Sequence, residues 1–455
     1  MTSTPSVAGG NSHASLPAPQ QRVIWGLAWP IMLSNITVPL LGLVDTAILG
    51  HLDSVSPLAA VAIGAQIFTL LLWSFGFLRM GTTAVTAYEA GRAGLPQSVH
   101  VLYQSLWLVL PIGVVCACIA SIFTPLVVPL FGADTIVHHL TREYLAIRFW
   151  GIPITLLQYC LVGWFIGRGE TRIPMMMLIC ANLLNGLLNY YFVWHLNMGV
   201  EGVALGSLLA EGAAVGIAVW AASKRGLSLR IPRPDSDLLR RMIVINRDLF
   251  IRTLTLLLVF ALFAALGAAQ STETLAANAV LISLLLLISN ALDGFAHAAE
   301  SLIGRYTGAE VPDYVRRIIG LTGLNSLIAA LLLSVGFILL GETLFHLLTD
   351  NPAVLPRLKE MQVWLWLLPL SGFASYWLDG VMVGAQATAS MRNAMLGAAV
   401  LIFLPLATMP WWWTTSIDSN TLLWTAFHCF LVARAAFLLP ALLRIIATQS
   451  QAKSG

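Results

Sequence analysis

Charged residues are scarce in this sequence. Asp, Glu, Lys and Arg make up 10% of the 455 residues, whereas soluble domains carry about 25%. Hydrophobic residues make up 58% of the chain, and the mean hydropathy is +0.83. This composition excludes an ordinary soluble domain. It predicts an all-α integral membrane protein, because a chain that crosses a bilayer must satisfy its backbone hydrogen bonds internally.

Signatures of several other chemistries are absent as well. The sequence contains no Walker motif, which excludes a built-in ATPase. No Ser/His/Asp constellation stands out, so we expect no enzyme, including an intramembrane enzyme acting on lipid. Cysteine is rare, and the few residues present lack metal-ligand spacing, so we expect small buried hydrophobic side chains and no metal site. These are Cys116, Cys118, Cys160, Cys180 and Cys429. We also expect no cofactor and no nucleic-acid partner.

Long apolar runs dominate what is present. A transmembrane helix needs about 20 predominantly apolar residues. We predict twelve such helices, near residues 24–49, 57–80, 101–130, 141–166, 173–195, 200–222, 244–269, 275–304, 318–340, 361–385, 393–412 and 420–446. An even number of spans places both chain ends on the same side of the membrane.

The distribution of Lys and Arg predicts which side this is. Sixteen of these residues fall in one set of loops and tails, and only four fall in the opposite set, namely Arg142, Arg148, Arg357 and Lys359. Positive residues concentrate in cytoplasmic loops. We therefore expect a multi-pass protein of the bacterial inner membrane with both termini in the cytoplasm. Trp411, Trp412 and Trp413, on the outer side, are expected to anchor the interface.

The chain divides into two halves joined by a basic segment. We predict a disordered N-terminal tail over residues 1–20, because this stretch is rich in Ser, Pro, Ala and Gly and lacks the basic start of a signal peptide. Six-helix bundles are expected over 21–222 and 244–446. A cytoplasmic linker at 223–243 joins them, and a C-terminal tail covers 447–455.

A shift of 217 residues brings the two halves into register. Gly50 then meets Gly267, Gly91 meets Gly308, and Gly167 meets Gly384. Each repeat contains six spans, so both copies have the same orientation, and their symmetry axis should follow the membrane normal. Parallel repeats of this kind occur in secondary transporters, which place a substrate site between the halves.

Several motifs resemble those of a known family. The stretch LSNITVPLLGLVDTAILGHL resembles the first helix of multidrug and toxic compound extrusion (MATE) transporters, closest to their DNA-damage-inducible F (DinF) branch. The resemblance extends over residues 22–440 through IGRGETRIP, NRDLFIRTL, ALDGFAHAAESLIGRYTGA and LDGVMVGAQATASMRNAM. It implies two pseudo-symmetric six-helix bundles that form a V-shaped cleft. It also implies export driven by an inward proton or sodium gradient.

Asp45 is the main candidate for coupling. An Asp at the centre of a membrane helix costs about 2.5–3.5 kcal/mol, so such a residue is a functional candidate by default. Ser34 lies on the same helical face, and Pro39 removes a backbone hydrogen bond and would allow the helix to bend. In related transporters the matching Asp is the protonation site of the N-terminal bundle, supported by polar residues of helix five.

Helix five contains a polar stripe of Asn182, Asn185 and Asn189 on one face. The stripe either lines one water-filled pocket together with Asp45 or forms structural hydrogen bonds between helices, worth about 0.6 kcal/mol per residue. Some relatives carry a second carboxylate where this chain has Asn189. Asp45 is then the only carboxylate that the sequence places in this bundle, which disfavours a sodium site made by a pair of carboxylates.

The second half contains more intramembrane charge. Asp293, His297 and Glu300 share one face of helix eight, while the other candidates come from helices seven, ten and twelve: Arg252, Asp379 and Arg434. Structural pairs of Arg252 with Asp293 or Arg434 with Asp379 are as plausible as a coupling site. Sodium-driven family members use carboxylates of this bundle, but arginines would compete for them here.

These features predict a monomeric drug/proton antiporter. It would export amphipathic organic molecules, expected to be cationic, from a cleft in contact with membrane lipid. Aromatic and Met side chains are candidates for the cleft wall: Phe68, Trp73, Phe149, Trp164, Met175, Met176 and Met177. The alternatives are a sodium-coupled exporter of the same fold and a lipid-linked oligosaccharide flippase of the wider superfamily. A flippase would require more basic residues in the cleft.

Overall fold

The computed structural model describes residues 16–50, 55–132, 134–228, 230, 232–411 and 418–451, with the backbone alone for 36–47, 49–50, 411 and 449–451. Within these residues every regular element is a helix and none is a strand, so the predicted all-α fold class is confirmed. Ten helical segments of the described chain are long and apolar enough to cross a membrane. The two other predicted spans are occupied by helices of 30 and 23 residues. The chain is a multi-pass membrane protein.

The first half contains the helices α1 (Gln21–Gly50), α2 (Ser56–Trp73), α3 (Phe77–Arg92), α4 (Ser98–Val127), α5 (Thr135–Arg148), α6 (Ile152–Gly167), α7 (Arg172–Trp194) and α8 (Gly199–Ser223). Short 3₁₀ turns follow α4 at Val128–Phe131 and α5 at Phe149–Gly151. The predicted span 57–80 is therefore two helices, because the chain leaves the α-helix at residues 74–76 and α3 continues to Arg92.

The second half contains α9 (Ser236–Ala268), α10 (Thr272–Gly308), α11 (Pro312–Leu348), α12 (Leu355–Glu360), α13 (Gln362–Gly384), α14 (Thr388–Gly397), α15 (Leu404–Ala407) and α16 (Ser419–Gln451). A π-helical segment, Ala398–Phe403, joins α14 to α15, and a 3₁₀ turn covers Met409–Trp411. The predicted Trp anchor lies outside the described side chains.

Several helices extend beyond the apolar runs that revealed them. α9 begins at Ser236, inside the stretch expected to be linker, where Asp235 caps it by accepting hydrogen bonds from the backbone N–H groups of Asp237 and Leu238. α16 continues to Gln451, inside the predicted C-terminal tail. The prediction counted apolar residues, and a capped helix can continue past the apolar layer. The domain boundaries themselves stay predictions.

Part of the predicted N-terminal tail packs against the second half. Leu16 contacts the hydrophobic core, Pro19 is buried, and the hydroxyl of Tyr306 donates to the carbonyl of Pro17 at 2.8 Å. The prediction of disorder was therefore wrong for residues 16–20. Residues 1–15 lie outside the described part of the chain.

The internal repeat is visible in the arrangement of helices. A shift of 217 residues places α9 on α1, α11 on α4 and α16 on α8. The crossing of α3 and α10 shows the same repeat. A Cβ atom on Gly91 would lie 2.0 Å from the carbonyl oxygen of Arg305, and one on Gly308 would lie 2.0 Å from that of Tyr88. Tyr88 and Arg305 are themselves separated by 217 residues, so the crossing lies on the pseudo-twofold axis.

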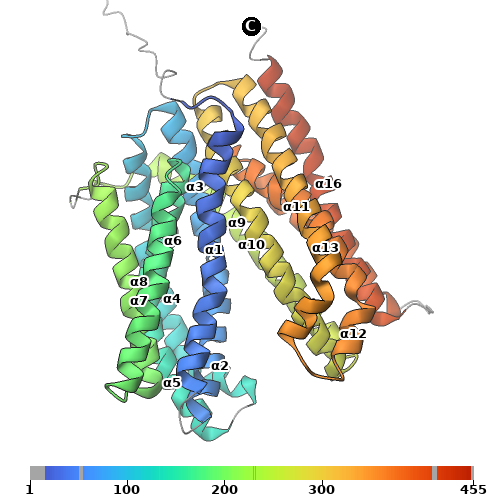
Figure 1. The fold of residues 1–455 in the computed structure, drawn as a ribbon. Coiled ribbons are helices and arrows are strands. Elements are labelled where there is room, and N and C mark those ends of the chain that lie inside the picture. The colour runs from blue at the N-terminus through green and yellow to red at the C-terminus, as the bar shows by residue number, and fades with distance from the viewer. Residues whose placement is uncertain are drawn as a thin grey trace, which may run out of the picture.

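The two halves converge at one end and diverge at the other (Figure 1). The first residues of α1 and the last residues of α16 both lie at the convergent end, as an even number of spans requires (Figure 1). α1 and α3 of the first half pack against α10 of the second. The V shape implied by the resemblance is therefore present in the fold.

Candidate functional site

The asparagine stripe of α7 faces into the first bundle. Asn189 donates to the Oδ1 atom of Asn185 at 2.9 Å, and Asn185 donates to the hydroxyl of Ser207 on α8 at 2.7 Å. Both asparagines are buried, and Asn182 is half-buried with a polar contact of its own. The predicted direction of the stripe is therefore confirmed. Gly206 of α8 allows the close approach, because a Cβ there would lie 2.1 Å from Asn189 Oδ1.

α1 packs against α7. Ser34 is buried and donates to the carbonyl of Ile31 at 2.8 Å. Asp45 and Pro39 belong to the helical backbone of α1, but their side chains lie outside the described part of the structure. The pocket that would join Asp45 to the asparagines stays a prediction.

The first bundle contains a buried ion pair that the sequence analysis missed. Arg148 at the end of α5 donates to Glu211 of α8 at 2.7 Å, and the hydroxyl of Thr155 donates to the same carboxylate at 2.8 Å. Arg148 also lies over the ring of Phe68 at 4.0 Å. Two expectations were wrong: Arg148 is not a loop residue, and Asp45 is not the only carboxylate of this bundle. The sequence did contain a sign of this pair, because Arg148 lies within the predicted span 141–166 and Glu211 lies within the span 200–222.

In the second half, Asp379 of α13 binds two arginines. Arg434 of α16 donates to its Oδ2 atom at 2.8 Å, and Arg252 of α9 forms an ion pair with the same oxygen. The predicted pair of Arg434 with Asp379 is confirmed. The alternative pair of Arg252 with Asp293 is wrong, because Arg252 binds Asp379 instead. All three side chains are at most 12% exposed.

A second cluster links the two halves. Arg79 of α3 donates to Glu300 of α10 at 3.3 Å and lies 3.2 Å from the Nδ1 atom of His297. His297 and Glu300 are 3.3 Å apart on the same face of α10, as predicted from their spacing. Asp293 is within electrostatic range of Arg79 and His297 but makes no hydrogen bond or ion pair in the described part of the chain.

Sequence reasoning left Arg79 unassigned. Its partner Glu300 is 221 residues away in the chain, and no local spacing relates the two residues. The packing of α3 against α10 brings them together. The charge cluster predicted for the second half therefore depends on a cation from the first half.

The convergent end is closed by a further polar network. Glu89 of α3 binds Arg92 at 2.6 Å and Arg241 of α9 at 3.1 Å. Gln386, between α13 and α14, accepts from Arg241 and donates to the carbonyl of Ala84 at 3.0 Å. The contacts of Glu89 with Arg241 and of Gln386 with Ala84 cross between the halves, so they hold this end of the molecule together.

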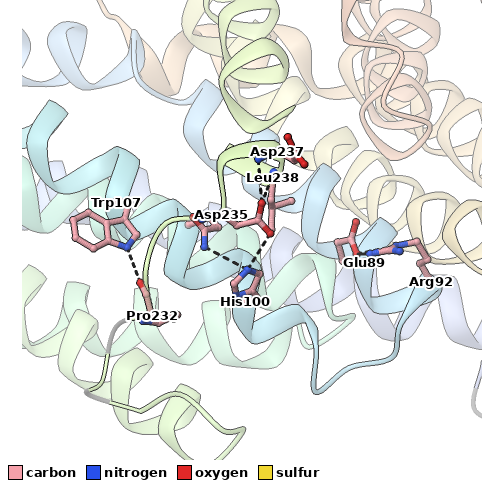
Figure 2. A network of polar contacts seen from close by, with 9 residues as sticks. Glu89, Arg92, His100, Trp107, Pro232, Asp235, Asp237 and Leu238 are labelled. Atoms are coloured by element: carbon pink, nitrogen blue, oxygen red, sulfur yellow. Dashed lines mark hydrogen bonds and ion pairs between the residues drawn. The ribbon is translucent and has the colours of Figure 1, made fainter. Parts of the chain in front are cut away.

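A hydrophilic pocket of about 620 Å³ lies beside this network, lined by α3, α4 and the start of α9. Figure 2 shows Asp235 there with His100 and with the backbone N–H groups of the α9 terminus. Hydrogen bonds from Leu238 and Asp237, together with His100, lower the pKa of the Asp235 carboxyl. On the adjoining loop, burial lowers the pKa of Arg168, which Glu170 partly offsets.

Two adjoining cavities of about 200 and 270 Å³ lie between α9, α10 and the end of α2. They share the wall residues Trp73, Phe260 and Leu286. Trp73 is the only expected cleft residue found in these walls. Phe149, Trp164 and Met177 are core residues, whereas Met176 lies on the exposed surface of α7.

Known proteins share both the sequence pattern and this fold. The MatE family model matches residues 30–191 and again residues 249–409. The chain belongs to the MATE family. It is 36% identical over 92% of its length to the DNA damage-inducible protein F of Escherichia coli strain K12, and covers 91% of that protein. It is 24% identical over 72% of its length to a probable multidrug resistance protein NorM of Thermotoga maritima, also covering 72% of it.

A solved structure shows the same MATE fold. The chain resembles the Vibrio cholerae MATE transporter VcmN in its bent form with a TM-score of 0.84 and 17% sequence identity. The superposition covers 95% of this chain and 98% of VcmN. The two MatE matches also coincide with the two halves predicted from the internal repeat, so the repeat is confirmed.

Proposed function

We propose that this MATE-family protein is a secondary active multidrug exporter of the bacterial inner membrane, with both termini in the cytoplasm. It exchanges amphipathic organic compounds for protons. The observation that carries the proposal is the architecture: two repeated bundles are tied together at one end and diverge at the other (Figure 1). Two cavities lie in the second bundle, and Trp73 of the first bundle contributes to the walls of both. The names of its relatives, which include multidrug resistance proteins, support the same class.

The proposed coupling residue is Asp45, assisted by Ser34 and the asparagine stripe. Protonation from outside would let α1 bend at Pro39, shrink the pocket and release the substrate. Rocking of the two halves would then expose Asp45 to the cytoplasm, where the proton leaves. A proton that enters down a potential of about 100 mV supplies roughly 2.3 kcal/mol before any pH difference.

Two carboxylates of the second half, Asp379 and Glu300, favour protons over sodium as the coupling ion, because arginines already bind them. A sodium site needs several oxygen ligands that are not already occupied by cations. Asp379 binds two arginines, and Glu300 binds Arg79. Neither carboxylate is free to hold sodium without first releasing an arginine, which would leave a buried charge uncompensated.

The test is export from proteoliposomes with proton and sodium gradients imposed separately. We expect a pH gradient to drive export and a sodium gradient at constant pH to be ineffective. Asp45→Asn should insert normally and lose at least about 90% of proton-driven export, while Asp313→Asn, at an exposed acid, should behave as wild type. Wild-type export by Asp45→Asn, or export driven by sodium alone, would overturn the proposal.

A further inference from the structure

The cavities between α9 and α10 are apolar almost throughout. The cavity of about 200 Å³, named the inner cavity, is lined by aliphatic and aromatic side chains of α9, α10 and α16, including Leu256, Leu285, Phe427 and Leu431. The adjoining cavity adds Phe263, Leu275 and Ile282. Together they offer the body of an amphipathic molecule a surface of the kind that drug-sized ligand sites use.

One charged side chain lines the inner cavity, among the described residues. This is Arg434, which is 3% exposed. Its Nη2 atom donates to Asp379, and the described structure gives its Nε and Nη1 atoms no hydrogen-bond partner. A guanidinium has five N–H donors and stays protonated in proteins. Arg434 therefore brings unused donors and a positive charge to the wall of an apolar cavity.

The charge of Arg434 is only partly neutralised. Asp379 is shared between Arg434 and Arg252, so two buried cations face one anion. The Nε atom of Arg252 is itself buried without a partner in the described structure. Neither Asp379 nor any other carboxylate lines the cavity among the described residues. Asp293 is within electrostatic range of Arg252 but forms no ion pair with either arginine in the described part of the chain.

Hydroxyl groups lie near this cation. Thr253 of α9, Ser289 of α10 and Tyr376 of α13 line the same cavity. Arg434, Asp379 and Asp293 are all within electrostatic range of Tyr376. The cavity thus combines one cation and three hydroxyl groups with a wall that is otherwise mostly apolar.

We propose that this cavity is a subsite for the acidic end of an amphipathic substrate. A carboxylate or sulfonate would bind the guanidinium of Arg434, and its apolar body would lie against Phe260, Phe427 and Trp73. This inference rests on the proposed function, and for this subsite it reverses the expectation of cationic substrates. A cation would meet Arg434 without any lining carboxylate to receive it. Anionic drugs and acidic membrane lipids share the required chemistry.

Binding of three matched probes to the full-length protein tests the proposal. The probes are dansyl-11-aminoundecanoate, its primary amide and the corresponding amine, titrated into purified protein in phosphatidylcholine nanodiscs. We expect wild type to bind the carboxylate at least about tenfold more tightly than the amine. Arg434→Gln should weaken carboxylate binding about tenfold and leave the other two probes within about twofold. Asp379 keeps Arg252 as a partner in this variant, so no lone carboxylate is created.

Two further variants make the result specific. Arg317→Gln, at an exposed arginine of α11, should leave all three affinities unchanged. Leu286 lines both cavities, so Leu286→Trp should narrow them and weaken the binding of all three probes. Equal wild-type affinities for carboxylate and amine, or no effect of Arg434→Gln on a folded protein, would overturn the subsite. If Arg434→Gln does not fold, the proposal is tested by the wild-type preference for the carboxylate over the amine and by weaker binding of the probes to Leu286→Trp.

The source of the acid and the proposed function are tested separately. Displacement of the carboxylate probe by phosphatidylglycerol in the nanodisc would support the subsite and identify membrane lipid as its occupant. Retained probe binding in the presence of that lipid would support a free organic acid. Probe binding requires no ion gradient. Intact binding with no gradient-driven export would therefore contradict the exporter and leave the subsite standing.

Discussion

Most buried charges in the described part of the chain are paired, as expected from the cost of burying an isolated ion. An unpaired charge in a low-dielectric interior loses its hydration without compensation. Accordingly Glu211 binds Arg148, Asp379 binds two arginines, and Glu300 binds Arg79. Two positions of the charge clusters depart from full pairing. Asp293 has no ion pair in the described structure, and Arg434 keeps unused donors toward a cavity.

The pair of Arg148 and Glu211 offers a quantitative test. Arg148→Met removes the cation and leaves Glu211 without its partner, which should destabilise the protein by about 3 kcal/mol, the lower end for a buried pair because Glu211 is 21% exposed. The double variant with Glu211→Gln should recover most of that loss. The measurement is thermal unfolding of the protein in detergent, with Arg142→Met as the control.

Additive effects in that comparison would mean that the two charges do not interact in the folded protein. A coupling energy above about 1 kcal/mol would agree with the geometry.

At the scale of elements, the contact of α3 with α10 depends on glycine. Gly91 and Gly308 each lie against a backbone carbonyl of the other helix, related by the pseudo-twofold axis. Backbones that approach so closely leave no room for a side chain, and small residues commonly mark such crossings in membrane proteins. The same relation explains why these two glycines matched in the internal repeat.

Gly91→Ala and Gly308→Ala should therefore be destabilising by similar amounts. The new Cβ atom meets a carbonyl oxygen at 2.0 Å, so the helices must separate, and overpacking of this kind costs about 1–3 kcal/mol. Gly320→Ala, in α11 with nothing within 4 Å of the new Cβ atom, is the matched control and should be neutral or stabilising. Equal thermal stability of the variants and the control would contradict a tight crossing.

At the scale of the whole molecule, the two halves are joined at the convergent end and diverge beyond it (Figure 1). The bonds of Glu89 with Arg241 and of Gln386 with Ala84 cross between the halves there. If the halves rock against each other during transport, these bonds must break and re-form. They therefore contribute to the free-energy difference between the described arrangement and one that opens at this end.

Glu89→Gln should shift that equilibrium toward opening. A partly exposed ion pair contributes up to about 1 kcal/mol, which corresponds to an approximately fivefold change in the open population. The measurement is the distance distribution between spin labels at the exposed residues Gln97 and Ala389, one on each half. Glu310→Gln, at an exposed acid away from the network, is the control. An unchanged distribution in Glu89→Gln would show that the network does not hold the halves together.

Much of the fold was predictable because its determinants are local. Each span is a run of apolar residues, so composition along a short window locates it, and the structure places helices at all twelve predicted positions. The duplication was visible as one ungapped offset, which the two family matches repeat. The inward direction of Asn185 and Asn189 followed from helical spacing, since amide groups are poorly accommodated by lipid.

Only the tertiary structure decided which charges meet. The sequence showed that Arg252, Asp293, Asp379 and Arg434 lie within spans, but it could not choose among their pairings, because each partner comes from a different helix. Arg79 reaches Glu300 across 221 residues, and Arg148 reaches Glu211 across 63. The cavity beside Arg434 likewise requires α2, α9, α10, α13 and α16 together. Local composition determines that a helix forms and spans the membrane, whereas the packing of distant helices determines which side chains share a site.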